Sequence, residues 1–111
     1  MVPKAMNNCR TQVESNHQVL YVSGEVDLSW SQQVRKAVLE ALGTGMPVAV
    51  DLSAVEYIDS SGIAALVEGF QLARGKKQVF TLLKISKPVL SVLKLARLDR
   101  VFVLVDEIPA V

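Results

Sequence analysis

Apolar and polar residues follow two different periods along this chain, and the changes between the periods mark the expected elements. Residues 9–14 and 18–23 show the near-alternation of strands that pack one face on a core. Only three residues separate these runs, and so short a connection predicts an antiparallel hairpin. From Ser29 to Leu42, apolar residues recur at the spacing of an amphipathic helix.

The ends of this first helix carry their own signals. Ser29 followed by Gln32 has the spacing of a capping box, and Gly43 is well placed to end the helix. We therefore expect the helix to begin at Ser29 and to stop before Gly43.

The remainder of the chain alternates strands with helices. Residues 48–52 are typical of a strand covered on both faces, and a short polar connection is expected after them. A helix should begin at residues 59–62 and end at Gly75, with Gly69 marking close packing. The last expected elements are a strand at 78–84, a helix opening at Ser86-Lys87-Pro88 and a strand at 101–105.

The resulting order is β-β-α-β-α-β-α-β, which predicts one α/β domain. Right-handed crossovers between the later strands make the sheet mostly parallel, with the first strand antiparallel. The sequence shows no repeat or linker, so residues 1–111 are expected to be a single domain with its core at about 9–105. The last residues, 106–111, are too short and Pro-interrupted to assign.

Composition narrows the class of protein. Half of the residues are apolar and 21% are charged, which is typical of a folded domain. The net charge is +1, and Lys and Arg are scattered with no basic run beyond Lys76-Lys77, so a nucleic-acid partner is not expected. The single cysteine, Cys9, excludes an internal disulfide and a zinc site, which favours a reducing compartment.

Neither a signal peptide nor a membrane span is expected. Residues 1–8 lack the apolar core of a signal peptide. No apolar run approaches the roughly 18 residues that a membrane-spanning helix needs. We therefore expect a cytoplasmic protein without direct membrane insertion.

Two serines at the predicted start of the second helix are the leading candidates for chemistry. Backbone N–H groups are unpaired there, so the position tolerates an anion. Either Asp59 or Ser60 is expected to cap the helix, which leaves Ser61 in the first turn with its hydroxyl toward the surface. The plainer alternative is that both serines only cap the helix.

Asp27 and Asp59 each follow a predicted strand. If these strands are neighbours, both carboxylates rim the same surface as the serines. The alternative is that each aspartate only serves its own turn or cap. No metal or cofactor is required by this set.

The residues and motifs that catalysis would need are missing, so the sequence does not support an enzyme. Ser61 lacks the G-x-S-x-G elbow, and His17, expected to be exposed in the hairpin, is the only histidine. Phosphate-loop and dinucleotide motifs are absent. Asp59 and Lys87 suggest a receiver domain only superficially, since no acidic pair follows the first strand to hold Mg²⁺. Cys9 is expected to be a small apolar residue near a strand start and not a reactive thiol.

Several motifs together resemble a known family. They are Gly-Glu-Val-Asp-Leu at 24–28, Val-Asp-Leu-Ser at 50–53, Tyr-Ile-Asp-Ser-Ser-Gly at 57–62 and the segment 85–102. In this order they are similar to a STAS domain, and more closely to a bacterial anti-sigma factor antagonist. The likeness runs from about Val13 to Val105, and the Asp-Ser-Ser-Gly block is its specific part.

The resemblance implies a non-enzymatic partner-switching regulator of transcription. The unmodified antagonist would bind an anti-sigma factor that is also a serine protein kinase. That kinase would phosphorylate Ser61, with Ser60 the second choice, and a PP2C-type phosphatase would remove the phosphate. Asp27, Asp59, Ser60, Ser61 and Gly62 would form the partner-binding surface. The family's C-terminal helix is stunted here, since 106–111 leaves little room.

Two other functions remain open. The domain could instead be a STAS accessory subunit that holds the ATPase of a phospholipid ABC transporter, or a scaffold of a stress-sensing complex. A weak nucleotide hydrolase is disfavoured by the missing base, metal ligands and phosphate loop.

Overall fold

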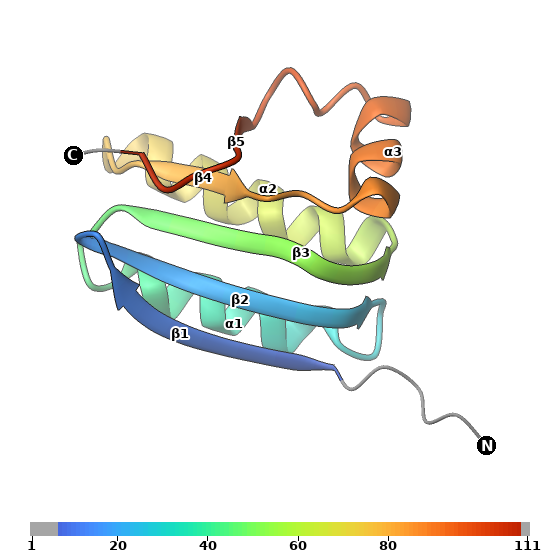
Figure 1. Cartoon of the computed structure of the whole chain (residues 1–111), viewed down its shortest axis with the longest axis horizontal. Helices are drawn as coiled ribbons and strands as arrows, with labels where there is room; N and C mark the ends of the chain where they lie inside the picture. Colours follow the sequence, from blue (N-terminus) through green and yellow to red (C-terminus); the bar gives the residue numbers. More distant parts are fainter. Residues whose placement is uncertain (1–6, 110–111) are drawn as a thin grey trace.

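A computed structural model describes residues 7–109 and confirms the expected α/β fold (Figure 1). One five-stranded sheet has the order β1-β2-β3-β4-β5, in which β1 runs antiparallel to β2 and every later pair is parallel. The elements are β1 (Asn8–Glu14), β2 (His17–Val26), α1 (Ser31–Leu42), β3 (Val48–Ile58), α2 (Ser60–Gly75), β4 (Phe80–Leu83), α3 (Lys87–Leu95) and β5 (Val103–Val105).

The helices cover the sheet and close one main core. Helices α1 and α2 lie side by side against one face of the sheet, and α3 packs against β3 (Figure 1). Leu20, Val50 and Leu82, one from each central strand, are fully buried in this core. A Cβ on Gly69 would lie 2.5 Å from Val38 Cγ1, so the close packing expected at Gly69 is that of α2 on α1. Within residues 7–109, no helix is both long and apolar enough to cross a membrane.

The hairpin forms as expected, but its histidine does not lie where the sequence suggested. Ser15 and Asn16 both have positive φ, 49° and 64°, the pattern of a two-residue type I′ hairpin turn. His17 then opens β2 and is fully buried, with its Nδ1 3.0 Å from the carbonyl oxygen of Ser15. The expectation of an exposed His17 was therefore wrong, because a loop of only two residues places His17 within the strand.

Strand β3 is longer than predicted, and this decides where the candidate site lies. The polar connection expected after Leu52 was wrong, because the strand continues to Ile58. Val55 and Ile58 are both buried, and pairing with β2 persists to the end of the strand. Two register irregularities, between Tyr21 and Ser23 and between Gly24 and Glu25 of β2, each accommodate one extra residue on β3 and hide the strand's period.

The start of α1 also differs from the prediction. The helix begins at Ser31 and not at Ser29, its N-cap residue is Trp30, and no side chain caps it. Instead, the backbone N–H and the hydroxyl of Ser29 both donate to Asp27 Oδ1, at 3.0 and 2.6 Å. The capping box of Ser29 and Gln32 is absent because Ser29 belongs to this Asp27 turn. Strands β4 and β5 are each shorter than the expected 78–84 and 101–105.

Candidate functional site

The parallel pairing of β2 with β3 brings the two candidate aspartates to the same place. Val26 and Ile58 form the last pair between the strands, and Asp27 and Asp59 are the residues that directly follow them. The Asp59 backbone N–H donates to the Val26 carbonyl oxygen at 3.2 Å, which ties the two chain segments together. The strand register thus places Asp27 and Asp59 at the same end of the two neighbouring strands.

Asp59 is the cap of α2, one of the two alternatives left open by the sequence. Its backbone is extended, with φ −111° and ψ −172°, and its side chain reaches over the first turn of the helix. Oδ1 accepts from the N–H groups of Ser61 at 2.9 Å and Gly62 at 3.2 Å. These are the donors that a helix start leaves unpaired, and pairing them with a carboxylate stabilises the helix by roughly 1 kcal/mol.

The two serines occupy different environments. Ser60 is the first residue of α2 and is exposed, whereas Ser61 is half-buried. The Ser61 hydroxyl donates to Asp59 Oδ1 at 2.6 Å. This hydrogen bond, together with the N–H groups of Gly62, Ser61 and Leu28, lowers the pKa of Asp59 below its usual value, against partial burial. Asp59 is therefore ionised at neutral pH and holds the Ser61 hydroxyl.

Gly62 has no room for a side chain. An added Cβ would lie 2.6 Å from Ile58 Cγ1, 2.7 Å from the Val26 carbonyl oxygen and 2.8 Å from Val26 Cγ1. The start of α2 is therefore pressed directly onto the last pair of β2 and β3. This contact fixes the position of Ser61 relative to Asp27.

The same aspartate–serine turn occurs three times between residues 7 and 109. Ser29 on Asp27, Ser53 on Asp51 and Ser61 on Asp59 each donate a hydroxyl hydrogen bond of 2.6 Å to the aspartate two residues earlier. Of these turns, the one at Asp59 opens a helix. Ser61 is therefore distinguished by its place at a helix start and not by its hydrogen bond. The Asp-Leu-Ser tripeptides at 27–29 and 51–53 were the sequence signal of this repetition.

Two exposed apolar residues flank the site, and sequence reasoning missed both. Leu28, whose backbone N–H helps to stabilise the Asp59 carboxylate, is 76% exposed. Tyr57, two residues before Asp59, is 50% exposed. The sequence signal for an exposed Leu28 was its position between two polar turn residues, at 27–29. We group Leu28 and Tyr57 with Asp27, Asp59, Ser60 and Ser61 under the name Ser61 surface. Gly62, the fifth expected residue of the partner-binding surface, is buried and does not belong to it.

The remaining candidates lie elsewhere. Cys9 packs against the main core, and burial raises the pKa of its thiol to about 11, so little thiolate forms at neutral pH. His17 is buried at the opposite end of β2 from Asp27. Among residues 7–109, no three His, Cys, Asp or Glu side chains come close enough to hold a metal ion. The Ser61 surface offers a hydroxyl that can accept a group, next to an ionised carboxylate.

Comparison with known proteins agrees with the fold. The sequence model of the family described as "Mlab, STAS domain" matches residues 9–106. The chain therefore belongs to the STAS domain family.

Solved structures of similar fold include several anti-sigma factor antagonists. One from Mycobacterium paratuberculosis superposes with a TM-score of 0.83 at 24% identity, over 93% of this chain and 88% of that one. An anti-sigma factor antagonist (STAS) domain protein from Planctomyces limnophilus superposes with a TM-score of 0.77 at 24% identity. The superposition covers 90% of this chain and 91% of that one. The Bacillus cell fate determinant SpoIIAA in its phosphorylated form superposes with a TM-score of 0.69 at 17% identity. The superposition covers 90% of this chain and 92% of that one. At these identities the likeness establishes the fold.

Proposed function

We propose that this protein is an anti-sigma factor antagonist that acts by partner switching. In its unmodified form it binds an anti-sigma factor with serine kinase activity, and phosphorylation of Ser61 releases that partner. The observation that carries the proposal is the place of Ser61: in the first turn of α2, beside the ends of β2 and β3, with its hydroxyl held by Asp59. Family membership and the similar antagonists of known structure support it.

The Ser61 surface has the composition of a docking site for a protein. Leu28 and Tyr57 supply apolar area that a partner can cover, and aromatic residues of this kind often anchor interfaces. Asp27 and Asp59 supply acidic groups whose positions are fixed by their own turns. Because the partner would cover Ser61 along with these residues, a change at Ser61 acts directly on the contact.

A phosphate on Ser61 changes this surface locally. The modification adds about −1.5 to −2 charges and replaces the hydroxyl proton, so the hydrogen bond to Asp59 is lost. Repulsion from the ionised Asp59 turns the phosphate outward, onto the area that the partner covers. A partner carboxylate about 5 Å from one phosphate charge is repelled by roughly 3 kcal/mol at an effective dielectric near 20. Half of that value already weakens binding about tenfold. The N-terminal end of α2 stabilises the phosphate by about 0.3–1 kcal/mol, so the fold is retained.

Phosphate mapping after incubation with the partner kinase tests this function. The protein is used as bait in an extract of its source organism, with and without ATP, and its intact mass is then measured. One added phosphate on Ser61 is expected, and release of the captured anti-sigma factor in the ATP sample. The Ser61→Ala variant should retain the partner and gain no phosphate.

Ser29→Ala and Ser53→Ala are matched controls. Each removes a hydroxyl with the same aspartate hydrogen bond, and each should leave the phosphorylation unchanged. A phosphate on Ser60, on Ser53 or on no residue would overturn the site assignment. Capture of an ABC transporter ATPase without any phosphate would favour the alternative function as a transporter accessory subunit. A PP2C-type phosphatase, the expected partner for the reset, should restore the original mass.

A further inference from the structure

Strand β1 forms an open edge of the sheet. All seven of its residues pair with β2 without a register shift, and among residues 7–109 no strand pairs with its outer side (Figure 1). Five of the seven residues are exposed, and the strand contains neither proline nor lysine, which commonly protect such edges. A long, regular and exposed edge strand offers its backbone to another strand.

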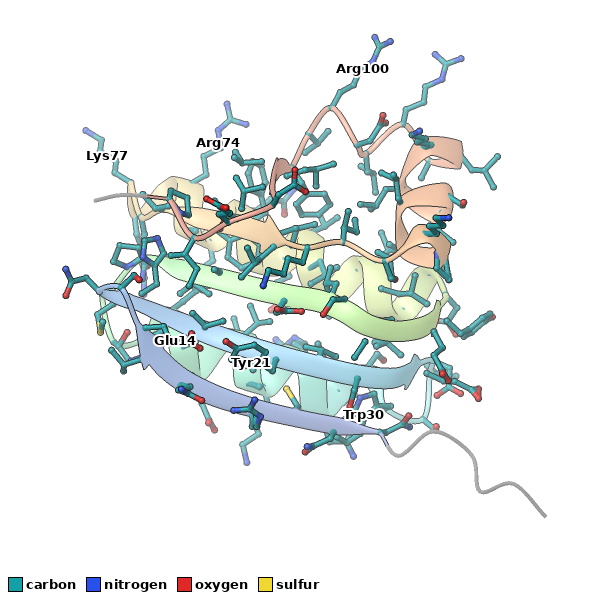
Figure 2. All side chains as sticks on the ribbon, in the orientation of Figure 1. Glu14, Tyr21, Trp30, Arg74, Lys77 and Arg100 are labelled. Carbon is teal, nitrogen blue, oxygen red and sulfur yellow. The ribbon has the colours of Figure 1, made fainter. Side chains whose placement is uncertain are left out.

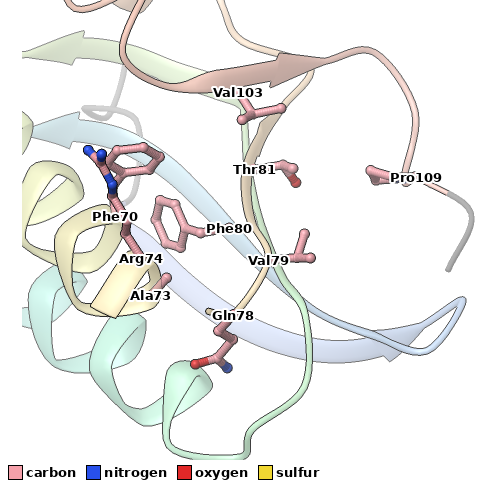
Figure 3. Close-up of a pocket in the computed structure, with 9 residues that line it drawn as sticks. All are labelled: Phe70, Ala73, Arg74, Gln78, Val79, Phe80, Thr81, Val103 and Pro109. Carbon is pink, nitrogen blue, oxygen red and sulfur yellow. The ribbon is translucent and has the colours of Figure 1, made fainter. Parts of the chain in front are cut away.

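The opposite edge of the sheet is protected. Strand β5 has three residues, and its neighbour β4 has four. Figure 3 shows this edge, where Val103 of β5 lies beside Thr81 of β4 and the chain continues to Pro109. A short edge strand followed closely by a proline, which has no backbone N–H to donate, is poorly suited to pairing. Of the two edges, β1 is therefore the one that a second strand can extend.

The outer side of β1 presents the backbone groups of Thr11 and Val13. Glu14 and His17 close the two-residue hairpin turn, and the closing pair of such a turn is hydrogen-bonded. Hydrogen-bonded and non-hydrogen-bonded pairs alternate in an antiparallel ladder, so the N–H and C=O groups of Thr11 and Val13 point away from β2. The N–H of Cys9, the next outward residue, accordingly donates to the side chain of the preceding residue at 2.9 Å.

The charges of β1 are arranged symmetrically about Gln12. Arg10 lies two residues before it and Glu14 two residues after it. Both charged side chains lie on one face of the sheet, because the Arg10 guanidinium is 4.3 Å from the centre of the Tyr21 ring and Glu14 accepts a hydrogen bond from the Tyr21 hydroxyl (Figure 2). Arg10 also donates to Gln12 Oε1 at 2.8 Å. Neither charge forms an ion pair in the described part of the chain.

We propose that β1 pairs antiparallel with β1 of a second copy of this chain, about a two-fold axis at Gln12. In this register Gln12 faces the Gln12 of the second copy, and Arg10 faces its Glu14. Thr11 faces Val13, and their outward backbone groups form the hydrogen bonds of the new ladder. The symmetry repeats each contact, which gives two ion pairs in the dimer. Strand β1 contains no residue of the Ser61 surface, so the proposal does not rest on the antagonist function.

The charges select this register over its neighbours. An axis between two residues would set outward backbone groups against groups that already bond to β2. With the axis at Thr11 or at Val13, neither charged residue faces an opposite charge. With the axis at Arg10 or at Glu14, two like charges face each other, which opposes pairing. An axis at Gln12 is the arrangement in which both charges are paired.

Charge exchange tests the contact between copies. Sedimentation equilibrium over about a hundredfold range of protein concentration should show a reversible monomer–dimer equilibrium. Arg10→Glu and Glu14→Arg each set like charges opposite each other twice in the dimer, and each should raise its Kd about tenfold or more. The double exchange, Arg10→Glu with Glu14→Arg, should return the Kd to within about threefold of the parent value. Such rescue reports on the dimer, because the two residues are about 13 Å apart along one strand.

A cysteine at the axis tests the register. In a Cys9→Ala background, which removes the native thiol, Gln12→Cys should form a disulfide-linked dimer on oxidation with glutathione disulfide. Directly opposed residues have Cβ atoms about 4.5–5.5 Å apart, which a small adjustment brings into disulfide range. Asn8→Cys is the matched control, because it keeps both ion pairs. In the proposed register the two Asn8 positions lie about 26 Å apart, too far for a disulfide.

Three results would overturn the proposal. The first is a protein that stays monomeric over the whole range of concentration. The second is a dimer whose affinity is changed by neither single exchange, or is not restored by the double exchange. The third is equal cross-linking of Gln12→Cys and Asn8→Cys. Phosphorylation of Ser61 is measured separately on the same variants, so failure of the dimer is distinguishable from failure of the proposed function.

Discussion

Gly62 is the position next to the Ser61 surface where the structure constrains substitution most tightly. In Gly62→Ala, the new Cβ would lie under 3 Å from three atoms of Val26 and Ile58, and one of these atoms is a backbone carbonyl oxygen. Both side chains are almost fully buried, so they have little room to move away. Overpacking of this kind costs about 1–3 kcal/mol, even though alanine favours a helix by about 1 kcal/mol over glycine.

The assay is thermal or urea unfolding of Gly62→Ala beside Gly75→Ala. Overpacking less the helix preference of alanine leaves a net cost of up to about 2 kcal/mol. At about 4 °C per kcal/mol for a domain of this size, Gly62→Ala should lower the unfolding midpoint by up to about 8 °C. A Cβ on Gly75 meets no atom within 4 Å, so Gly75→Ala should equal or exceed the parent in stability. Equal stability of the two variants would refute the reasoning that α2 is pressed onto the ends of β2 and β3.

Three further predictions concern ionisable groups. Because the pKa of Asp59 is lowered in the folded protein, its contribution to stability should be fully present above about pH 4 and lost as the pH falls through the lowered value. In urea unfolding from pH 2 to 6, Asp59→Asn, which keeps a capping oxygen, should lack this part of the pH dependence. Burial raises the pKa of Cys9 from 9.0 to about 11, so iodoacetamide at pH 8 should alkylate the native thiol about a hundredfold more slowly than the denatured one. The hydrogen bond to Glu14 is the main cause of the raised pKa of Tyr21, so Glu14→Gln should lower that pKa in a phenolate absorbance titration.

The sequence predicted the fold well where local patterns and global packing agree. The stripe that includes Val34 and Val38 identified α1, and Gly75 marked the end of α2 as observed. The extent of β3 was missed because its second half buries residues three apart, at Val55 and Ile58, and not at alternate positions. That spacing arises from an irregular pairing with β2, which a single-strand pattern does not reveal.

The candidate site was predictable in its residues but not in its geometry. The Asp-Ser-Ser-Gly order indicated a helix start, yet only the structure decides that Asp59 rather than Ser60 is the cap. Asp27 lies 32 positions from Asp59 in the sequence, and the pairing of Val26 with Ile58 joins them.

The affinity of the captured anti-sigma factor for the unmodified and the Ser61-phosphorylated protein tests the central proposal most directly. Calorimetric titration should give binding at least tenfold weaker for the phosphorylated form, and Ser61→Asp should weaken binding in the same direction. Ser29→Asp, a charge placed on the neighbouring aspartate–serine turn, should have the smaller effect. Equal affinity of the unmodified and phosphorylated proteins would contradict the account.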